Sequence, residues 1–248
     1  MKNNKNILKK MFEIGNGNVP IVLSCPHGGF KKPKLIPDIK KGVKLSDRYT
    51  LYLARRIIHD LNIKNIKLYY IFSKAHRSKV DLNRPPGTSA AFDQSSEYAR
   101  EIHYLFHDKI KNLAKKCIKL YNKCLFIDFH GFTKPHQEYQ DIIFGNIFSN
   151  TLSIKLKNHT SEDPQFWGVK EFKTQFLNHF TIDDGLGVND INIGYSGGYI
   201  THQFYRKENI NAIQIEIADN IRKSIEISNL FVDDFIKAIL NCLENINY

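Results

Sequence analysis

The stretch Ile21-Val22-Leu23-Ser24-Cys25-Pro26-His27-Gly28-Gly29 decides the fold that the sequence predicts. Its apolar first half is typical of a buried β-strand. A histidine and two glycines follow, and open α/β sheets bind ligands at the carboxyl ends of their strands, where glycine lets the backbone approach closely. Taken alone, His27 also fits a structural histidine in a tight turn, so a functional role requires partners elsewhere in the chain.

A second stretch, Leu125-Phe126-Ile127-Asp128-Phe129-His130-Gly131, repeats this pattern. Two strands of one sheet that each end in a histidine would place two imidazoles at the same edge, as a divalent metal site requires. Asp128 projects from the same face of the strand as His130, so it can orient that histidine or be a ligand itself. The alternative is two unrelated turn histidines.

Strand patterns alternate with helical patterns along the rest of the chain. The periodicity predicts strands at residues 21–25, 66–72, 124–129, 141–145 and 212–217. It predicts helices from a Ser46 N-cap to about residue 61, at about 97–120 and at about 225–243. This alternation predicts an α/β fold of one domain over residues 1–248, with a mostly parallel central sheet and helices on both faces.

Two polar segments are candidates for substrate binding and proton transfer. Asn83 and Arg84 precede a double proline that stiffens the loop, and arginine can bind a carboxylate through two parallel hydrogen bonds. The alternative for this loop is surface structure, with Asp81 as an internal ion-pair partner. Glu216 lies between isoleucines and, beside a metal, would serve as a general base. The alternative is a solvated strand face shared with Gln214.

Two further histidines share one helical face. His103 and His107 are four residues apart but lack the glutamate of the HExxH pattern, because Tyr104 follows the first of them. We therefore expect them to lie on an ordinary helix surface.

The composition is that of a globular protein of 248 residues, 42% of them hydrophobic and 12% aromatic. No run approaches the roughly 18 apolar residues that a membrane span needs, so we expect a soluble, cytoplasmic protein with no membrane partner.

The four cysteines lack CxxC spacing, which argues against a disulfide framework or a zinc–thiolate site. The net charge of +11 suits an anionic partner. Because the basic segments contain no nucleic-acid-binding motif, a small-molecule carboxylate is favoured over nucleic acid.

These motifs, taken in order, resemble the N-formylglutamate amidohydrolase family, a branch of the zinc-carboxypeptidase-like hydrolases. Each motif alone has low specificity, whereas the ordered set is highly specific and spans about residues 20 to 220. The motifs are Ser24-Cys25-Pro26-His27-Gly28-Gly29, Asp47-Arg48 with Tyr52, Val80-Asp81-Leu82-Asn83-Arg84-Pro85, Ile127-Asp128-Phe129-His130-Gly131, Gly197-Gly198-Tyr199-Ile200-Thr201 and Gln214-Ile215-Glu216-Ile217.

The resemblance implies a phosphorylase/hydrolase-like fold and one zinc ion held by His27, His130 and a carboxylate. Related carboxypeptidases have a glutamate three residues after the first histidine, but Phe30 occupies that position here. Asp47 is the predicted third ligand, and Asp128 is the alternative. The resemblance also implies that Glu216 is the general base. The implied substrate-binding residues are Arg77, Asn83, Arg84, Gly197, Gly198 and Thr201.

The implied activity is hydrolysis of the linear amide in an N-acyl amino acid, with N-formyl-L-glutamate giving formate and glutamate. The family commonly has an arginine shortly before the double glycine, whereas this chain reads Ile193-Gly194-Tyr195-Ser196, so a dicarboxylate substrate would lose one contact there. One alternative is a zinc carboxypeptidase or N-acyl amino acid deacylase that acts on a larger substrate. A second alternative is a non-catalytic, basic nucleic-acid-binding protein.

Overall fold

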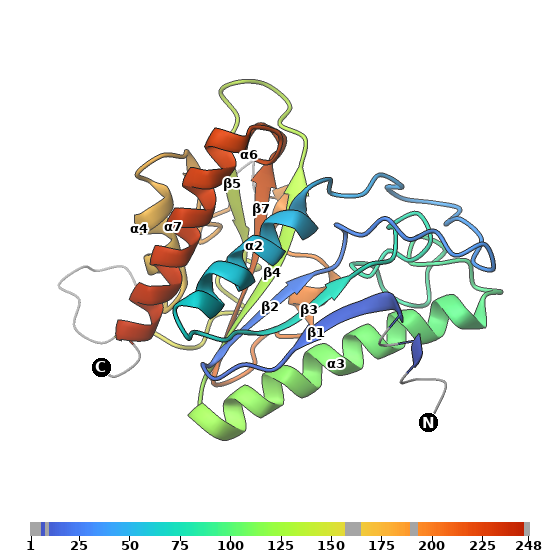
Figure 1. The fold of residues 1–248 in the computed structure, drawn as a ribbon, viewed down its shortest axis with the longest axis horizontal. Coiled ribbons are helices and arrows are strands. Elements are labelled where there is room, and N and C mark those ends of the chain that lie inside the picture. Colours follow the sequence, from blue (N-terminus) through green and yellow to red (C-terminus); the bar gives the residue numbers. More distant parts are fainter. Residues whose placement is uncertain (1–5, 8–9, 157–164, 189–192, 246–248) are drawn as a thin grey trace.

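A mixed β-sheet runs through the centre of this computed structural model, which describes residues 6–7, 10–156, 165–188 and 193–245 (Figure 1). Within these residues the sheet has seven strands in the order β1-β3-β2-β4-β7-β5-β6. The strands are β1 (Phe12–Gly15), β2 (Ile21–Cys25), β3 (Tyr69–Ser73), β4 (Cys124–Phe132), β5 (Ile142–Gly145), β6 (Ile182–Asp183) and β7 (Ile210–Ala218).

The four central strands, β3, β2, β4 and β7, are parallel, whereas β1 and β5 pair antiparallel with β3 and β7. Strands β2, β4 and β7 are buried along nearly their whole length, as expected for parallel strands covered on both faces. Their register pairs Ser24 with Asp128 and His130 with Glu216. The polar residues of three strands therefore meet at one edge of the sheet, and the predicted mostly parallel α/β fold is confirmed.

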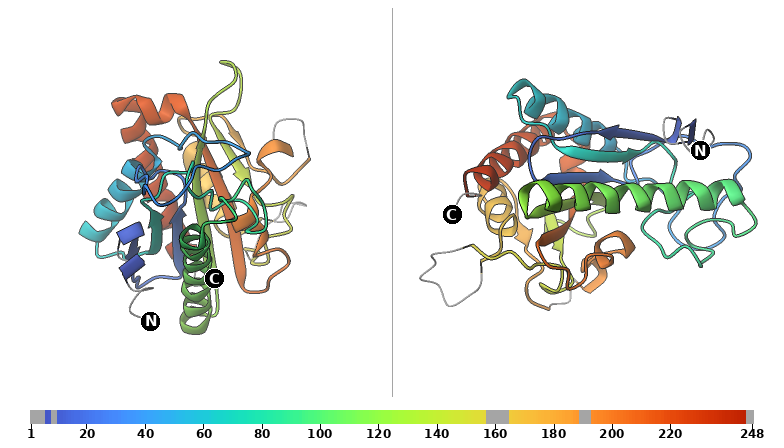
Figure 2. Two further views of the ribbon diagram at one scale, coloured as in Figure 1. Left: turned by 90° about the vertical axis from the view of Figure 1, so that its right-hand side faces the viewer. Right: turned by 90° about the horizontal axis from the view of Figure 1, so that it is seen from below.

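Helices cover both faces of the sheet. On one face, α2 (Thr50–Ile63), α4 (Val169–Phe176) and α7 (Ile225–Glu244) pack against residues such as Leu23, Ile127 and Ile215. On the other face, the long helix α3 (Glu97–Tyr121) packs against residues such as Val22 and Phe126 (Figure 2). The short elements are η1 (Ile193–Tyr195), α5 (Tyr199–His202) and α6 (Asp219–Lys223).

The predicted N-cap at Ser46 is wrong. Helix α2 begins at Thr50, whose amide and hydroxyl both donate to the main-chain oxygen of Asp47, at 3.2 and 2.7 Å. Tyr49 has a left-handed φ of 70°, so residues 47–49 form a turn instead of the first helical turn. Asp47 therefore stands before the helix, where its side chain is free to point toward the sheet edge.

Six short elements were not predicted from the periodicity: β1, β6, α4, η1, α5 and α6. Each has eight residues or fewer, which is too short for a clear repeat, and the two strands are ordered by pairing with β3 and β5. The predicted strand at 66–72 starts late, at Tyr69, because the amide of Ile66 donates to Leu61 in the turn that ends α2. No helix in the described part of the chain is both long and apolar enough to cross a membrane.

Candidate functional site

Two imidazoles and one carboxylate meet at the carboxyl edge of the sheet. His27 follows β2, His130 lies in β4, and Asp47 comes from the turn before α2. Nδ1 of His27 and Nδ1 of His130 lie 3.6 and 3.4 Å from Oδ2 of Asp47, and the ring centroids are 4.9 Å apart. All three residues are buried, and one ligand atom from each lies within 4.8 Å of the others. This group could hold a metal ion.

A further carboxylate lies behind each imidazole. Nε2 of His27 is 2.8 Å from Asp81, and Nε2 of His130 is 2.9 Å from Asp128. Asp128 also accepts a hydrogen bond from the Ser24 hydroxyl. We call the group of His27, Asp47 and His130 the centre. These contacts leave Nδ1 of both rings directed at the Asp47 carboxylate, and Nδ1 of His27 is buried without a hydrogen-bond partner. Carboxylates in this position orient metal-binding histidines and fix their tautomer. Asp128, the alternative ligand, therefore contacts the ring nitrogen that faces away from Asp47.

The protonation states of the centre follow from its charges. Burial opposes ionisation of Asp47, but its contacts with His130 and His27 hold the pKa of its carboxyl well below the usual range. Burial also opposes charging of His130, but Asp128 and Asp47 raise the pKa of this imidazole well above its usual value. The pKa of Asp81 is lowered, because His27 and Arg77 outweigh its burial. The carboxyls of Asp47 and Asp81 therefore ionise more readily than free aspartates, which suits them to bind or orient cationic groups.

Arg77, a predicted substrate-binding residue, is paired within the protein. Its Nε donates to Oδ2 of Asp81 at 2.8 Å, and a terminal nitrogen donates to Oδ1 of Asp47 at 3.4 Å. The amide of Gly131 donates to the other oxygen of Asp47 at 3.1 Å. Arg77 therefore orients the carboxylates of Asp81 and Asp47 and forms ion pairs with both of them.

Glu216 lies in β7, directly across from His130 in the adjacent strand. It is buried, and its Oε1 accepts a hydrogen bond from Nε2 of Gln214 at 2.9 Å. Burial raises the pKa of Glu216 above its ordinary value, although His130 partly offsets the effect. A carboxylate with a raised pKa beside a cation site is suited to accepting and returning a proton.

An open cleft of about 820 Å³ lies over this centre. Asp47, His130 and Glu216 line it, and Phe30, at the position where related enzymes have a ligand, is 62% exposed at its wall. Five of the six predicted substrate-binding residues also line the cleft: Arg77, Asn83, Arg84, Gly197 and Gly198. The sixth, Thr201, is fully buried behind it.

The side chain of Asn83 is used within the protein. Its Nδ2 donates to Oε1 of Gln214 at 3.3 Å, and its Oδ1 accepts from the amide of Ile200 at 2.9 Å. The Gly198 amide also donates to Gln214, at 2.8 Å. A Cβ atom on Gly198 would lie 2.0 Å from Nδ2 of Asn83, so only glycine fits there. Asn83 thus fixes the double-glycine loop against β7.

Arg222 also belongs to the site, although it was not among the residues predicted from the sequence. This residue lies in α6, lines the cleft and is only 8% exposed. Burial lowers the pKa of its guanidinium below the usual arginine value, in contrast to Arg77, whose pKa its carboxylate partners raise. The sequence offers only a weak signal for it, an arginine six residues after Glu216.

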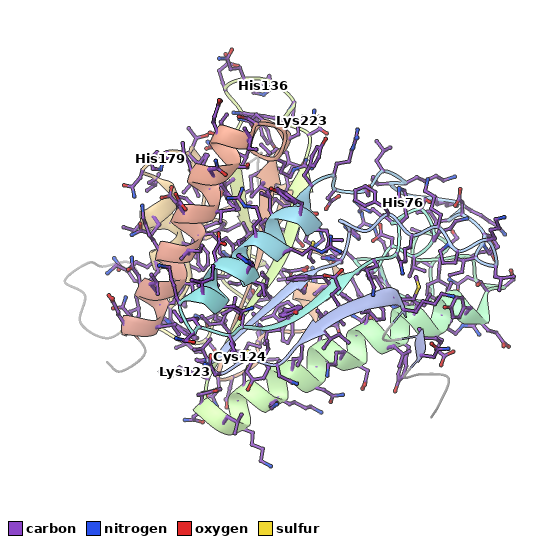
Figure 3. All side chains as sticks on the ribbon, in the orientation of Figure 1. His76, Lys123, Cys124, His136, His179 and Lys223 are labelled. Atoms are coloured by element: carbon purple, nitrogen blue, oxygen red, sulfur yellow. The ribbon has the colours of Figure 1, made fainter. Side chains whose placement is uncertain are left out.

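The prediction for His103 and His107 is wrong, because both are buried, at 2% and 6% exposure. Their Nε2 atoms lie 2.9 Å from the main-chain oxygens of Arg84 and Leu82, respectively. They therefore tie α3 to the loop that carries Asn83. Two other histidines stand apart from the site: Figure 3 shows His136 on the β4–β5 loop and His179 near α4, and both are exposed.

The chain is similar to known proteins in sequence and in fold. The N-formylglutamate amidohydrolase family model matches residues 90–221, more than half of the chain. A crystal structure of N-formylglutamate amidohydrolase from Ralstonia eutropha is similar, with a TM-score of 0.67 and 14% identity over 95% of this chain and 98% of that one. A gene product of Agrobacterium tumefaciens gives the same TM-score and identity over 96% of each chain. No curated protein matches the sequence. The resemblance inferred from the motifs is thus confirmed, and the chain belongs to the N-formylglutamate amidohydrolase family.

Proposed function

We propose that this protein is a zinc-dependent amidohydrolase that cleaves the linear amide of an N-acyl amino acid. The observation that carries the proposal is the buried group of His27, Asp47 and His130 beside Glu216, with a carboxylate behind each imidazole. Two imidazoles and one carboxylate are the ligand set of zinc hydrolases such as thermolysin and carboxypeptidase A. Family membership supports the same reaction class.

The residues present fit a metal ion. The unpartnered, buried Nδ1 of His27 points to a ligand, since a buried polar atom without a partner is costly. His27, His130 and Asp47 would hold the ion, while Asp81 and Asp128 would orient the two rings. Zinc bound there would supply a water of lowered pKa and would polarise the amide carbonyl.

Glu216 would move the proton in this reaction. Its Oε1 accepts a hydrogen bond from Gln214, which leaves Oε2 for proton transfer. Water oxygen bonds to the amide carbon, Glu216 accepts the water proton, the carbon–nitrogen bond breaks, and Glu216 returns a proton to the leaving nitrogen. Arg84 lines the cleft without a described carboxylate partner, and it would hold the substrate carboxylate so that attack is effectively unimolecular.

N-formyl-L-glutamate is the substrate we propose, giving formate and L-glutamate. The Ralstonia eutropha protein of similar fold is described as an N-formylglutamate amidohydrolase, which supports this choice. The net charge of +11 favours an anionic substrate.

A second candidate is a carboxypeptidase or deacylase acting on a larger N-acyl amino acid or a peptide. The cleft volume of about 820 Å³ supports this candidate, because ligand pockets of ~300–1,000 Å³ accept drug-sized molecules. The same centre, base and arginine would serve this reaction, so only the tolerated acyl group differs.

The test is metal analysis of the purified protein followed by amine release from N-formyl, N-acetyl and dipeptide substrates of L-glutamate. We expect one zinc per chain and the fastest release from N-formyl-L-glutamate. The double variant His27→Ala/His130→Ala should lose both metal and activity. A protein with no stoichiometric metal and salt-sensitive nucleic-acid affinity would refute the proposal in favour of the non-catalytic alternative.

A further inference from the structure

Arg222 is a buried cation held entirely by main-chain oxygens. Its Nε donates to Ile217 at 3.1 Å, and its two terminal nitrogens donate to Arg48 and Phe132, each at 2.6 Å. Guanidinium has five N–H donors, so these three bonds leave two of them. The side chain lines the cleft although it is only 8% exposed.

The three oxygens fix the guanidinium where the segments of the site converge. Arg48 directly follows Asp47, Phe132 comes two residues after His130, and Ile217 directly follows Glu216. The guanidinium also packs on Gly131, where a Cβ atom would lie 2.6 Å from Nε of Arg222. Arg222 is therefore held rigidly beside the candidate metal ligands and the candidate base.

Within the part of the chain that the structure describes, the charge of Arg222 has no partner at ion-pair distance. Among the described residues, no carboxylate forms an ion pair with Arg222, whereas Arg77 in the same cleft is paired with Asp47 and Asp81. Asp219, three residues earlier, instead accepts from Lys223 at 2.5 Å and from the Lys134 amide at 3.0 Å. Carbonyl oxygens satisfy hydrogen bonds but carry no net charge, and buried charges in proteins are normally paired.

We propose that Arg222 binds a carboxylate of the ligand and makes the cleft selective for dicarboxylic amino acids. The identity of the ligand as an amino acid released from an amide rests on the function proposed above. Arg84 would bind one carboxylate, and Arg222 would bind the second. This assignment also accounts for the missing arginine before Gly197, because Arg222 supplies the contact from α6 instead of from that loop.

The test compares binding of L-glutamate and L-glutamine to the purified full chain by isothermal titration calorimetry. The two ligands have the same shape and differ by one charge. Because a hydrogen bond to a charged group contributes ~1.5–3 kcal/mol, the wild type should favour glutamate by about tenfold or more. Arg222→Met should bring this ratio close to one while glutamine still binds. Lys223→Met is the matched control, because it removes one exposed charge from the next residue and should keep most of the preference.

Three results would overturn the proposal. Equal weakening of both ligands in Arg222→Met would assign the arginine a purely structural role, and equal loss of preference in Lys223→Met would indicate a general field effect. A wild type without preference for glutamate would also refute it.

If Arg222→Met fails to fold, as judged by its thermal transition, the same comparison of glutamate and glutamine is made with Arg222→Lys. Lysine keeps the charge but offers no planar fork, so the ratio should fall several-fold, and an unchanged ratio would refute the proposal. A preference for glutamate that depends on Arg222, found together with no amide hydrolysis, would refute only the proposed reaction.

Discussion

The Oδ1 atom of Asp81 lies 2.8 Å from Nε2 of His27, on the side of the ring opposite the atom that faces Asp47. This contact joins the segment after β3 to the end of β2. Asp128 makes the equivalent contact with His130 from within β4. A carboxylate thus orients each imidazole, and such preorganisation lowers the entropy lost when a set of ligands is assembled.

Asp81→Asn should weaken metal binding by about 10–100-fold, the usual cost of removing such a partner. The amide keeps the size of the carboxylate but no longer stabilises the correct tautomer of His27. Zinc affinity measured by competition with a chromophoric chelator checks this, with Asp38→Asn, an exposed aspartate on the surface, as control. Unchanged affinity would show that Asp81 serves only Arg77 and the fold.

Metal removal should destabilise the protein. A ligand that binds only the folded state adds about 2.7 kcal/mol to the free energy of unfolding when it is present at 100 times its dissociation constant. The thermal transition should therefore fall on treatment with a chelator and recover on addition of zinc. The variant Asp47→Ala should show no such response, and a zinc-dependent shift in that variant would place the metal elsewhere.

Glu216→Gln should lower kcat by ~10²–10⁴-fold, the range of general acid–base catalysis, because the amide cannot accept the water proton. Zinc content should be unchanged, since Glu216 is not among the three proposed ligands. Steady-state formate release and metal analysis of the same preparation give both values. Normal turnover in the zinc-loaded variant would remove Glu216 as the base.

Gly198→Ala should lower kcat/KM by about 10²-fold, the cost of a misplacement near 1 Å in an active site. The added Cβ would meet the side-chain amide of Asn83, so the loop or the asparagine must move. Gly87→Ala is the control, because a Cβ there meets no atom within 4 Å. Equal kinetics for the two variants would mean that the loop position is unimportant.

Because of His107, the free energy of unfolding should depend on pH. Burial lowers the pKa of His107 to about 3, whereas the unfolded histidine titrates near 6.5. The unfolded state therefore binds more protons below pH 6.5, and the contribution of the neutral ring, complete above that pH, is lost as the pH falls.

His107→Gln tests this by urea unfolding at pH 7.5 and 5.5. The free-energy advantage of the wild type over the variant should shrink by about 1.4 kcal/mol between these two pH values. This is the effect of one histidine over one pH unit, because the unfolded histidine takes up its proton only below about pH 6.5. His59→Asn, at an exposed position, should show no comparable change. A constant difference between wild type and His107→Gln would mean that folding leaves the pKa of His107 unchanged.

Local sequence determined the central strands and the long helices. Strands β2 and β7 and helices α3 and α7 were predicted to within two residues of their ends, because burial on both faces or along one stripe leaves a periodic apolar pattern. Strand β4 begins as predicted but continues three residues beyond its predicted end at 129. The same strands carry His130 and Glu216, so the edge where polar residues would gather also followed from the sequence.

Only the tertiary structure decided which polar residues meet there. Asp81 and Arg222 reach the centre from a loop and a short helix, and no periodic pattern marks such segments. Asp47, in the turn before α2, was predicted only through its family motif. Their partners are distant in sequence, as with the Asp81–His27 and Arg222–Phe132 contacts. The roles of Asp128 behind His130 and of His107 inside the core depended likewise on packing, because burial and hydrogen-bond partners are properties of the assembled chain.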